Sequence, residues 1–232
     1  MGNEWVQTFD STQDYSVVWR KLPHWTQAGT VCFITWRTAD SMPRQVVGRW
    51  LRERNELLTA AGIVVESDDN PRTAAAAFQK FDLRSAIEKL DPAVQWKLQC
   101  DLTDRFDTHL DACHGACVLK QRKLADIVAE CLLKFDGSRY VLTDFVVMPN
   151  HVHLLAAFPD EETQLKQCAN WKRFMARAIH AANGGEGEFW QEDAFDHLVR
   201  SLEHFEHYRR YIANNGSKAG LAPHECLHYS KV

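Results

Sequence analysis

The chain has 232 residues, 45% of them hydrophobic, and its formal net charge is −4. This length and apolar content suffice for one well-buried core with a helical elaboration. The net negative charge argues against a surface that coats nucleic acid broadly, so any contact with DNA is expected to be a local patch. No apolar stretch approaches the length that spans a bilayer. Seven cysteines, an odd number, without an apolar segment at the start favour a reducing, cytoplasmic location.

The first half of the sequence is expected to be mostly helical. A strand is predicted at about residues 30–37, and a helix begins near Pro43. Residues 66–77 are polar and then low in complexity, which predicts a loop that enters another helix. Helical patterns dominate from there to about residue 135. The clearest amphipathic helix carries apolar side chains at Leu124, Ile127, Val128, Cys131 and Leu132.

Strands and helices alternate in the second half, after a turn at Asp136-Gly137. The predicted elements are a strand from Arg139 to Thr143 or beyond, a buried apolar strand over about residues 144–157 that contains the two histidines, a helix over 162–182, a further strand, and a helix over 201–215 that Ser201 caps and Gly216 stops.

This order of elements predicts an α+β fold. We expect a ferredoxin-like antiparallel sheet with helices on one side, plus a helical insertion between the first two strands. A single domain is expected over residues 1–232, with the insertion at about 60–120 and a short C-terminal tail at 217–232.

Two histidines, His151 and His153, lie two residues apart in an apolar strand. Because side chains alternate along a strand, both imidazoles project from the same face. Polar rings in such surroundings need a compensating partner. A metal ion is one such partner, and hydrogen bonding to backbone and water is the alternative.

The helix predicted over 201–215 carries Tyr211 and Asn215 on one face, because they are four residues apart. Asn215 thus offers an oxygen ligand one turn beyond the phenol. Tyr208 has Ile212 in the equivalent position, and an isoleucine cannot hold a metal. The apolar stripe that would pack on the sheet is formed by Leu202, Phe205 and Ile212.

Two segments resemble a known family. Residues 148–155, Met-Pro-Asn-His-Val-His-Leu-Leu, resemble the signature of the HUH single-strand nucleases. Residues 211–221, Tyr-Ile-Ala-Asn-Asn-Gly-Ser-Lys-Ala-Gly-Leu, are similar to the nucleophile segment of the REP-associated tyrosine transposases, which are Y1 transposases. Segments 22–43 and 189–200 look like the family's opening and its last strand. Gly216 and Ser217 replace the family's Pro and Val, which is expected to loosen the turn after the helix.

The resemblance implies an enzyme of DNA transposition that nicks and rejoins single-stranded DNA at hairpin, REP-like sites through a 5′ phosphotyrosine. It implies Tyr211 as the nucleophile and His151, His153 and Asn215 as ligands of a divalent metal, Mg²⁺ or Mn²⁺. The expected partner is single-stranded DNA with a hairpin, and no membrane is expected. A monomer is favoured over a homodimer. In a bacterium the protein would be cytoplasmic and associated with the nucleoid.

Basic and aromatic side chains are the candidates for DNA contact, and the alternatives are a solvated helix face and core aromatics. The candidates are Lys172, Arg173 and Arg177 on the helix 162–182, Arg200, Arg209, Arg210 and Lys218 around the tyrosine, and Trp171 and Trp190 as stacking platforms.

Two other functions fit parts of the sequence. A metal-dependent phosphohydrolase would use the histidine pair with activated water and form no covalent intermediate. A non-catalytic DNA-binding remnant is the other possibility, for which Gly216 and Ser217 are the only sequence indication. Metal titration with a labelled single strand separates all three.

Overall fold

The computed structural model describes residues 6–19, 23–64, 83–191 and 194–231. The chain divides into two compact units: unit 1 comprises Met1–Ser41 and Ala116–Val232, and unit 2 is Met42–Gly115. The loop and helix start predicted at 66–77 lie outside the described residues, as do Leu22 and Glu192 of the family-like segments.

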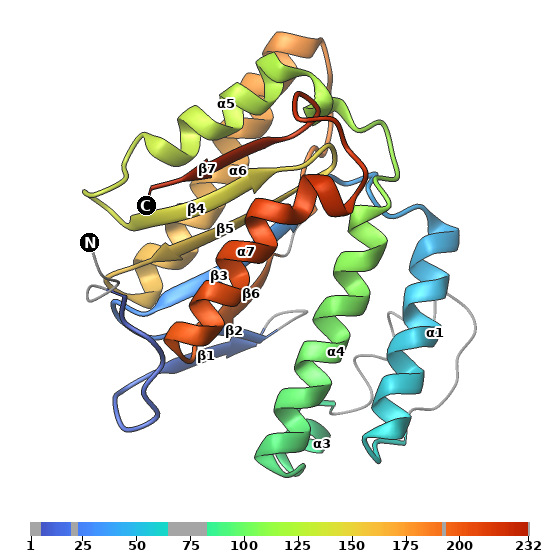
Figure 1. The fold of residues 1–232 in the computed structure, drawn as a ribbon, viewed down its shortest axis with the longest axis vertical. Helices are drawn as coiled ribbons and strands as arrows, with labels where there is room; N and C mark the ends of the chain where they lie inside the picture. Colours follow the sequence, from blue (N-terminus) through green and yellow to red (C-terminus); the bar gives the residue numbers. More distant parts are fainter. Residues whose placement is uncertain (1–5, 20–22, 65–82, 192–193, 232) are drawn as a thin grey trace. The chain divides into compact units, whose positions relative to one another are not determined.

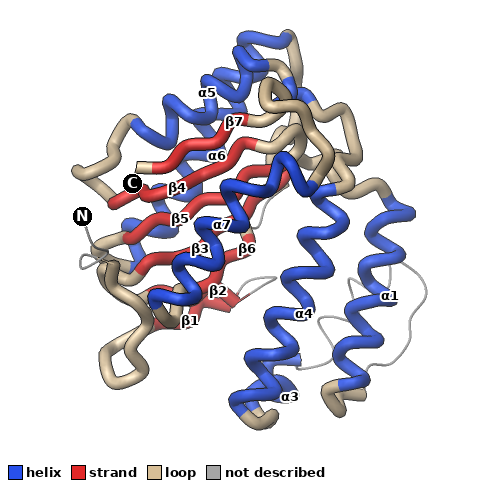
Figure 2. Tube along the Cα trace, in the orientation of Figure 1, coloured by secondary structure: helices blue, strands red, loops and turns tan. Residues whose placement is uncertain are grey.

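Unit 1 is built on a five-stranded antiparallel sheet in the order β6-β3-β5-β4-β7 (Figures 1 and 2). The α+β fold with an antiparallel sheet is therefore confirmed. A separate two-stranded sheet, β1-β2, precedes it and was not anticipated. The strands are β1 (Ser16–Trp19), β2 (Pro23–Thr26), β3 (Val31–Arg37), β4 (Val141–Val147), β5 (His151–Ala157), β6 (Phe195–Leu198) and β7 (Leu227–Ser230).

One face of the sheet packs against α5 (Arg122–Leu133) and α6 (Glu161–Asn183). Every second side chain of a strand enters this core, as the pleat requires. Trp36 of β3 and Leu154 of β5, for example, are at most 1% exposed there. The predicted helix 162–182 is confirmed, and it ends at Gly184, whose φ of 70° suits a residue without a side chain.

The opposite face of the sheet is covered by α7 (Leu202–Lys218), as Figure 1 shows. Phe205, Tyr208 and Ile212 of this helix pack against apolar side chains of β3, β4 and β5. The helices of unit 1 thus lie on both faces of the sheet, whereas the sequence led us to expect them on one side. Alternation along β5 explains the second layer, because Leu155 and Ala157 need cover as much as Leu154 does.

A bulge in β4 decides which residues face α7. The register with β5 shifts between Leu142 and Asp144, which leaves Thr143 as the extra residue. Leu142 and Phe145, three positions apart, consequently both enter the core under α5 and α6. Asp144 is paired with Leu155 and points to the α7 face.

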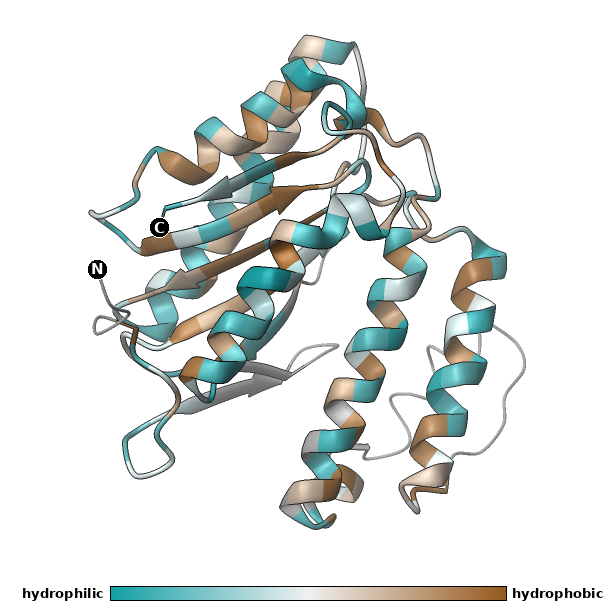
Figure 3. Cartoon of the chain, in the orientation of Figure 1, coloured by the Kyte–Doolittle hydropathy of each residue, from teal (hydrophilic) through white to brown (hydrophobic). Residues whose placement is uncertain are grey.

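Unit 2 is helical in its described residues. It contains α1 (Arg44–Ala60), α3 (Leu83–Glu88) and α4 (Pro92–Asp111). Asp91 caps α4 by accepting from the backbone amide of Ala93. Two small apolar clusters hold the helices together. Figure 3 shows hydrophobic and hydrophilic residues in turn along α1 and α4. Across the described ranges, no helix is long and apolar enough to cross a bilayer.

Candidate active site on the α7 face

His151 and His153 project from β5 on the face that α7 covers, and both are fully buried. Their ring centroids are 4.6 Å apart. The period of the strand therefore places the two imidazoles side by side, as expected from their spacing.

Each imidazole is held through its Nδ1 atom. His153 Nδ1 is hydrogen bonded to Thr35 Oγ1 at 2.7 Å, because Thr35 is its partner in the pairing of β3 with β5. His151 Nδ1 lies 2.8 Å from Asn150 Oδ1. A ring that donates from Nδ1 presents its lone pair at Nε2. Both rings are therefore oriented by fixed neighbours in the way that metal-binding histidines usually are.

Burial keeps the two rings neutral. It lowers the pKa of His151 to about 3. Burial also holds the pKa of His153 well below its usual range, and the positive charges of a protonated His151 and of Lys218 act in the same direction. Neutral imidazole is the form that binds metal ions.

Tyr211 of α7 brings its hydroxyl to His153. Its Oη lies 3.5 Å from His153 Nε2, at the outer limit of a hydrogen bond, and the two ring centroids are 5.2 Å apart. Phe33 supports this arrangement, since its ring stacks on Tyr208 at 4.1 Å and on His153 at 5.3 Å. Residues 58 positions apart in sequence thus meet on one face of the sheet.

Asn215 follows one turn after Tyr211 and is fully buried. Its Oδ1 and Nδ2 atoms have no hydrogen-bond partner among the residues that the structure describes. A buried amide without partners costs about 1–3 kcal/mol, so its retention suggests a ligand that supplies the missing interaction.

The helix does not stop at Gly216, contrary to the expectation from sequence. α7 continues to Lys218, with Ser201 as its cap, and Gly216 is buried inside it. A Cβ atom on Gly216 would lie 2.4 Å from the Sγ atom of Cys226, so glycine allows the tail to approach the helix. The turn after Asn215 is therefore regular helix, not a loosened loop.

The cationic candidates near Tyr211 occupy different positions. The Nζ atom of Lys218 lies 5.2 Å from the centre of the Tyr211 ring. Arg210 is exposed on α7, and Arg200 is exposed just before it. Arg209 instead turns to the sheet edge, where it forms an ion pair with Asp144, so its charge is used inside the protein. Arg209 is therefore a weaker candidate for DNA contact than the exposed Arg200 and Arg210.

Three other basic candidates lie on α6, in the layer across the sheet from the histidines. Arg173 and Arg177 are exposed, and their guanidinium groups lie 5.4 and 4.8 Å from the ring centre of Phe174. Lys172 donates to the backbone carbonyl of Gln191 at 3.3 Å. The sheet therefore separates these side chains from Tyr211.

The two tryptophans proposed as stacking platforms are core residues, so this expectation was wrong. Trp171 is 2% exposed and its ring contacts those of Trp36 and Tyr140. Trp190 is 5% exposed and also packs on Trp36. A ring surrounded by protein on both sides has no face on which a base could stack.

Sequence reasoning missed three residues on this face. Thr35 and Arg37 are the β3 partners of His153 and His151, and strand pairing cannot be deduced from either segment alone. Arg37 donates to Ser41 Oγ at 3.0 Å, and burial lowers its pKa to about 10, which leaves it charged at neutral pH. The third residue is Asp144, which the sequence shows only as a single acidic residue next to an apolar run.

Comparison with known proteins gives a likeness in fold only. No family model matches the sequence, and no curated protein matches it. Among solved structures, the chain is similar to a REP-associated tyrosine transposase bound to a REP hairpin, with a TM-score of 0.42 and 14% sequence identity. The similarity covers 84% of this chain and 72% of the other.

Proposed function

We propose that this protein is a metal-dependent HUH nuclease of the REP-associated tyrosine transposase type. In this proposal Tyr211 attacks a phosphodiester of single-stranded DNA, and the protein then rejoins the cut DNA strand. The observation that carries the proposal is the 3.5 Å approach of Tyr211 Oη to His153 Nε2, beside the second imidazole. The motif resemblance at 148–155 and 211–221 supports it independently.

The donor set fits a divalent cation. His151 and His153 are neutral and fixed through Nδ1, and Asn215 contributes a buried amide that lacks a partner among the described residues. Mixed nitrogen and oxygen ligands suit Mg²⁺ or Mn²⁺ under working conditions, although imidazole binds Zn²⁺ more tightly. Bound there, such an ion would supply Lewis-acid polarisation of the scissile phosphate.

Tyr211 is the proposed nucleophile, and a neighbouring cation favours its ionised form. A phenol has a pKa of about 10, so Tyr211 needs nearby positive charge to ionise at neutral pH. Lys218 supplies such a charge from 5.2 Å above the ring. Attack forms the bond from Tyr211 Oη to phosphorus and breaks the bond between phosphorus and the 3′ oxygen. The phenol gives up one proton and the 3′ oxygen takes up one, so the step is balanced. The phosphotyrosine ester preserves the bond energy, so a 3′ hydroxyl can reverse the step.

The proposed partner is single-stranded DNA that carries a hairpin. With a net charge of −4, the protein has to contact DNA through a local patch, for which Arg200, Arg210 and Lys218 are the exposed cations around α7. A monomer is consistent with the proposal, because the histidines and Tyr211 meet within one chain.

A gel assay tests the proposal. The full chain is incubated with Mn²⁺ and hairpin-bearing single-stranded oligonucleotides, and the product is resolved under denaturing conditions. We expect a covalent protein–DNA band that depends on Mn²⁺ and is absent in Tyr211→Phe. Tyr208→Phe, which changes a buried tyrosine on the same helix, is the matched control and should retain the band. Cleavage without any covalent band would favour the phosphohydrolase, and binding without cleavage would favour the DNA-binding remnant.

A further inference from the structure

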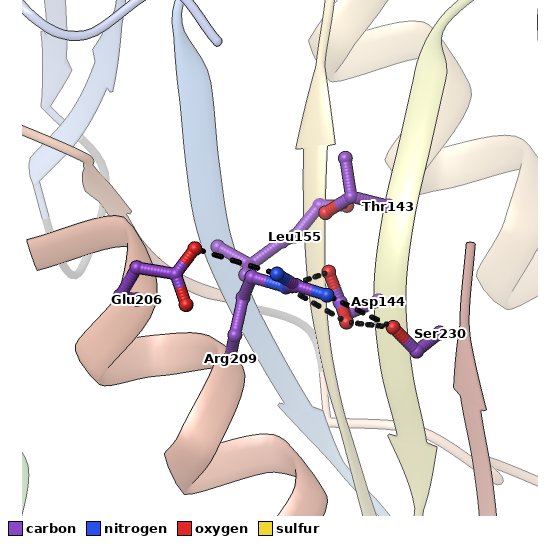
Figure 4. Close-up of polar contacts among 6 residues, drawn as sticks. All are labelled: Thr143, Asp144, Leu155, Glu206, Arg209 and Ser230. Atoms are coloured by element: carbon purple, nitrogen blue, oxygen red, sulfur yellow. Dashed lines mark hydrogen bonds and ion pairs between the residues drawn. The ribbon is translucent and has the colours of Figure 1, made fainter. Parts of the chain in front are cut away.

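An ion pair joins α7 to the sheet edge of unit 1 (Figure 4). Arg209 Nε donates to both carboxylate oxygens of Asp144, at 3.2 and 3.3 Å. Its Nη2 donates to Ser230 Oγ at 3.2 Å, and the Ser230 hydroxyl donates to Asp144 Oδ1 at 2.7 Å. Asp144 is 2% exposed. Charge-assisted hydrogen bonds in such surroundings are strong and directional.

The bulge in β4 makes this contact possible. Simple alternation would turn Asp144 to the same side as Leu142, under α5 and α6. The extra residue, Thr143, reverses the direction and presents the carboxylate to α7. Ser230 of β7 lies directly opposite Asp144 and completes the contact. The bulge therefore places Asp144 on the face where Arg209 can pair with it.

Arg209 and Tyr211 lie on opposite flanks of the buried stripe of α7. With about 100° between successive residues, Arg209 is about 100° to one side of Tyr208 and Tyr211 about 60° to the other. Side chains extend about 6 Å from a helix axis, so a rotation of α7 by about 20° moves the Tyr211 hydroxyl by about 2 Å. The stack of Tyr208 on Phe33 is an apolar contact without directed hydrogen bonds. The planar guanidinium of Arg209, in contrast, donates its hydrogen bonds in fixed directions.

We propose that Asp144 and Arg209 are positioning residues for Tyr211. Their ion pair fixes the rotation of α7, so that the hydroxyl stays beside His153 when DNA binds. The inference rests on the proposed function, because the step that it controls is the attack by Tyr211. A displacement of about 1 Å at a reacting atom costs about 100-fold in rate. The pair therefore acts on the rate of attack and not on DNA affinity.

The test uses the full chain with Mn²⁺ and saturating hairpin-bearing oligonucleotide. The single-turnover rate of adduct formation and the oligonucleotide Kd are measured separately. Arg209→Gln and Asp144→Asn are expected to lower the rate about 100-fold and to leave Kd within about twofold. Arg209→Lys should fall in between, because a lysine offers a point charge without the fork. Lys231→Gln is the matched control: it removes another ion pair at this sheet edge, 2.8 Å from Asp136, and should keep the wild-type rate.

The outcomes separate this inference from the proposed function. Equal rates for Arg209→Gln and wild type would overturn the positioning role and leave the proposed function standing. Absence of any adduct with the wild-type chain would overturn the proposed function. A raised Kd at an unchanged rate would return Arg209 to DNA binding and also contradict the inference. Circular dichroism checks that each variant folds. If Asp144→Asn does not fold, the variants of the partly exposed Arg209 alone test the positioning role.

Discussion

The hydroxyl of Thr35 lies 2.7 Å from Nδ1 of His153, and this contact orients the ring whose other nitrogen faces Tyr211. Both residues are at most 2% exposed. Thr35→Val keeps the shape of the side chain and leaves a buried ring nitrogen without its partner. We expect a loss of about 1–3 kcal/mol in the free energy of unfolding. Urea titration checks this value.

The same substitution should weaken the proposed metal site. Residues that orient a histidine ligand typically contribute about 10- to 100-fold to metal affinity. Calorimetric titration with Mn²⁺ measures the change, and Thr35→Ser, which retains a hydroxyl, should recover most of the affinity. Unchanged affinity in Thr35→Val would show that the contact is only structural.

His197 makes the stability of the fold depend on pH. This buried β6 side chain has its pKa lowered to about 3 by burial, with His204 and Arg200 adding to the effect. Between pH 6.5 and 3 the unfolded chain binds a proton there that the folded chain does not. The free energy of unfolding should therefore fall as the pH falls below about 6.5, by about 1.4 kcal/mol per pH unit for this residue.

Urea titrations across this pH range provide the measurement. His197→Gln should reduce the pH slope by about one proton, and His207→Gln, at an exposed position of α7, serves as the control. An identical slope in His197→Gln and wild type would contradict the assignment.

Gly216 and Cys226 should show energetic coupling. Alanine in a helix is more favourable than glycine by about 1 kcal/mol, but at 216 its Cβ would lie 2.4 Å from the sulfur. Gly216→Ala is expected to destabilise the chain by about 1–2 kcal/mol through overpacking. In a Cys226→Ala background the same change should be neutral or stabilising. A double-mutant cycle in urea measures the difference, and simple additivity would rule out the contact.

Substitution of Trp171 should lower stability without changing DNA binding, whereas substitution of Arg210 should weaken DNA binding. Trp171→Phe changes a core ring and should cost about 1–3 kcal/mol in stability, with no change in oligonucleotide affinity for the folded protein. Arg210→Gln alters an exposed cation and should weaken binding, with a salt dependence reduced by about one unit. Fluorescence anisotropy at several salt concentrations checks both. Weakened binding by folded Trp171→Phe would restore the ring as a contact.

The strand and helix patterns could be predicted from sequence because each has its own period. The alternation around His153 and the capped helix from Ser201 both follow from local residue order. Pairing is different, since it joins distant segments. Nothing near Thr35 indicates that it faces His153, and nothing in Leu142-Thr143-Asp144-Phe145 reveals that one of these residues forms a bulge.

Two further errors have the same origin. Gly216 was expected to end the helix because glycine commonly does so. The structure instead places this glycine inside the helix, where the close approach of Cys226 leaves no room for a side chain. Trp171 was considered for base stacking because aromatic type alone does not show burial. In both cases the role depends on contacts that exist only in the folded chain.

The most direct test of the proposed function is to identify the residue that carries the DNA. The covalent product formed with Mn²⁺ and a hairpin-bearing single strand is digested with nuclease and protease, and the peptides are sequenced by mass spectrometry. We predict a nucleotide attached through its 5′ phosphate to Tyr211. Attachment to any other residue, or a reaction that proceeds without a peptide adduct, would contradict the account.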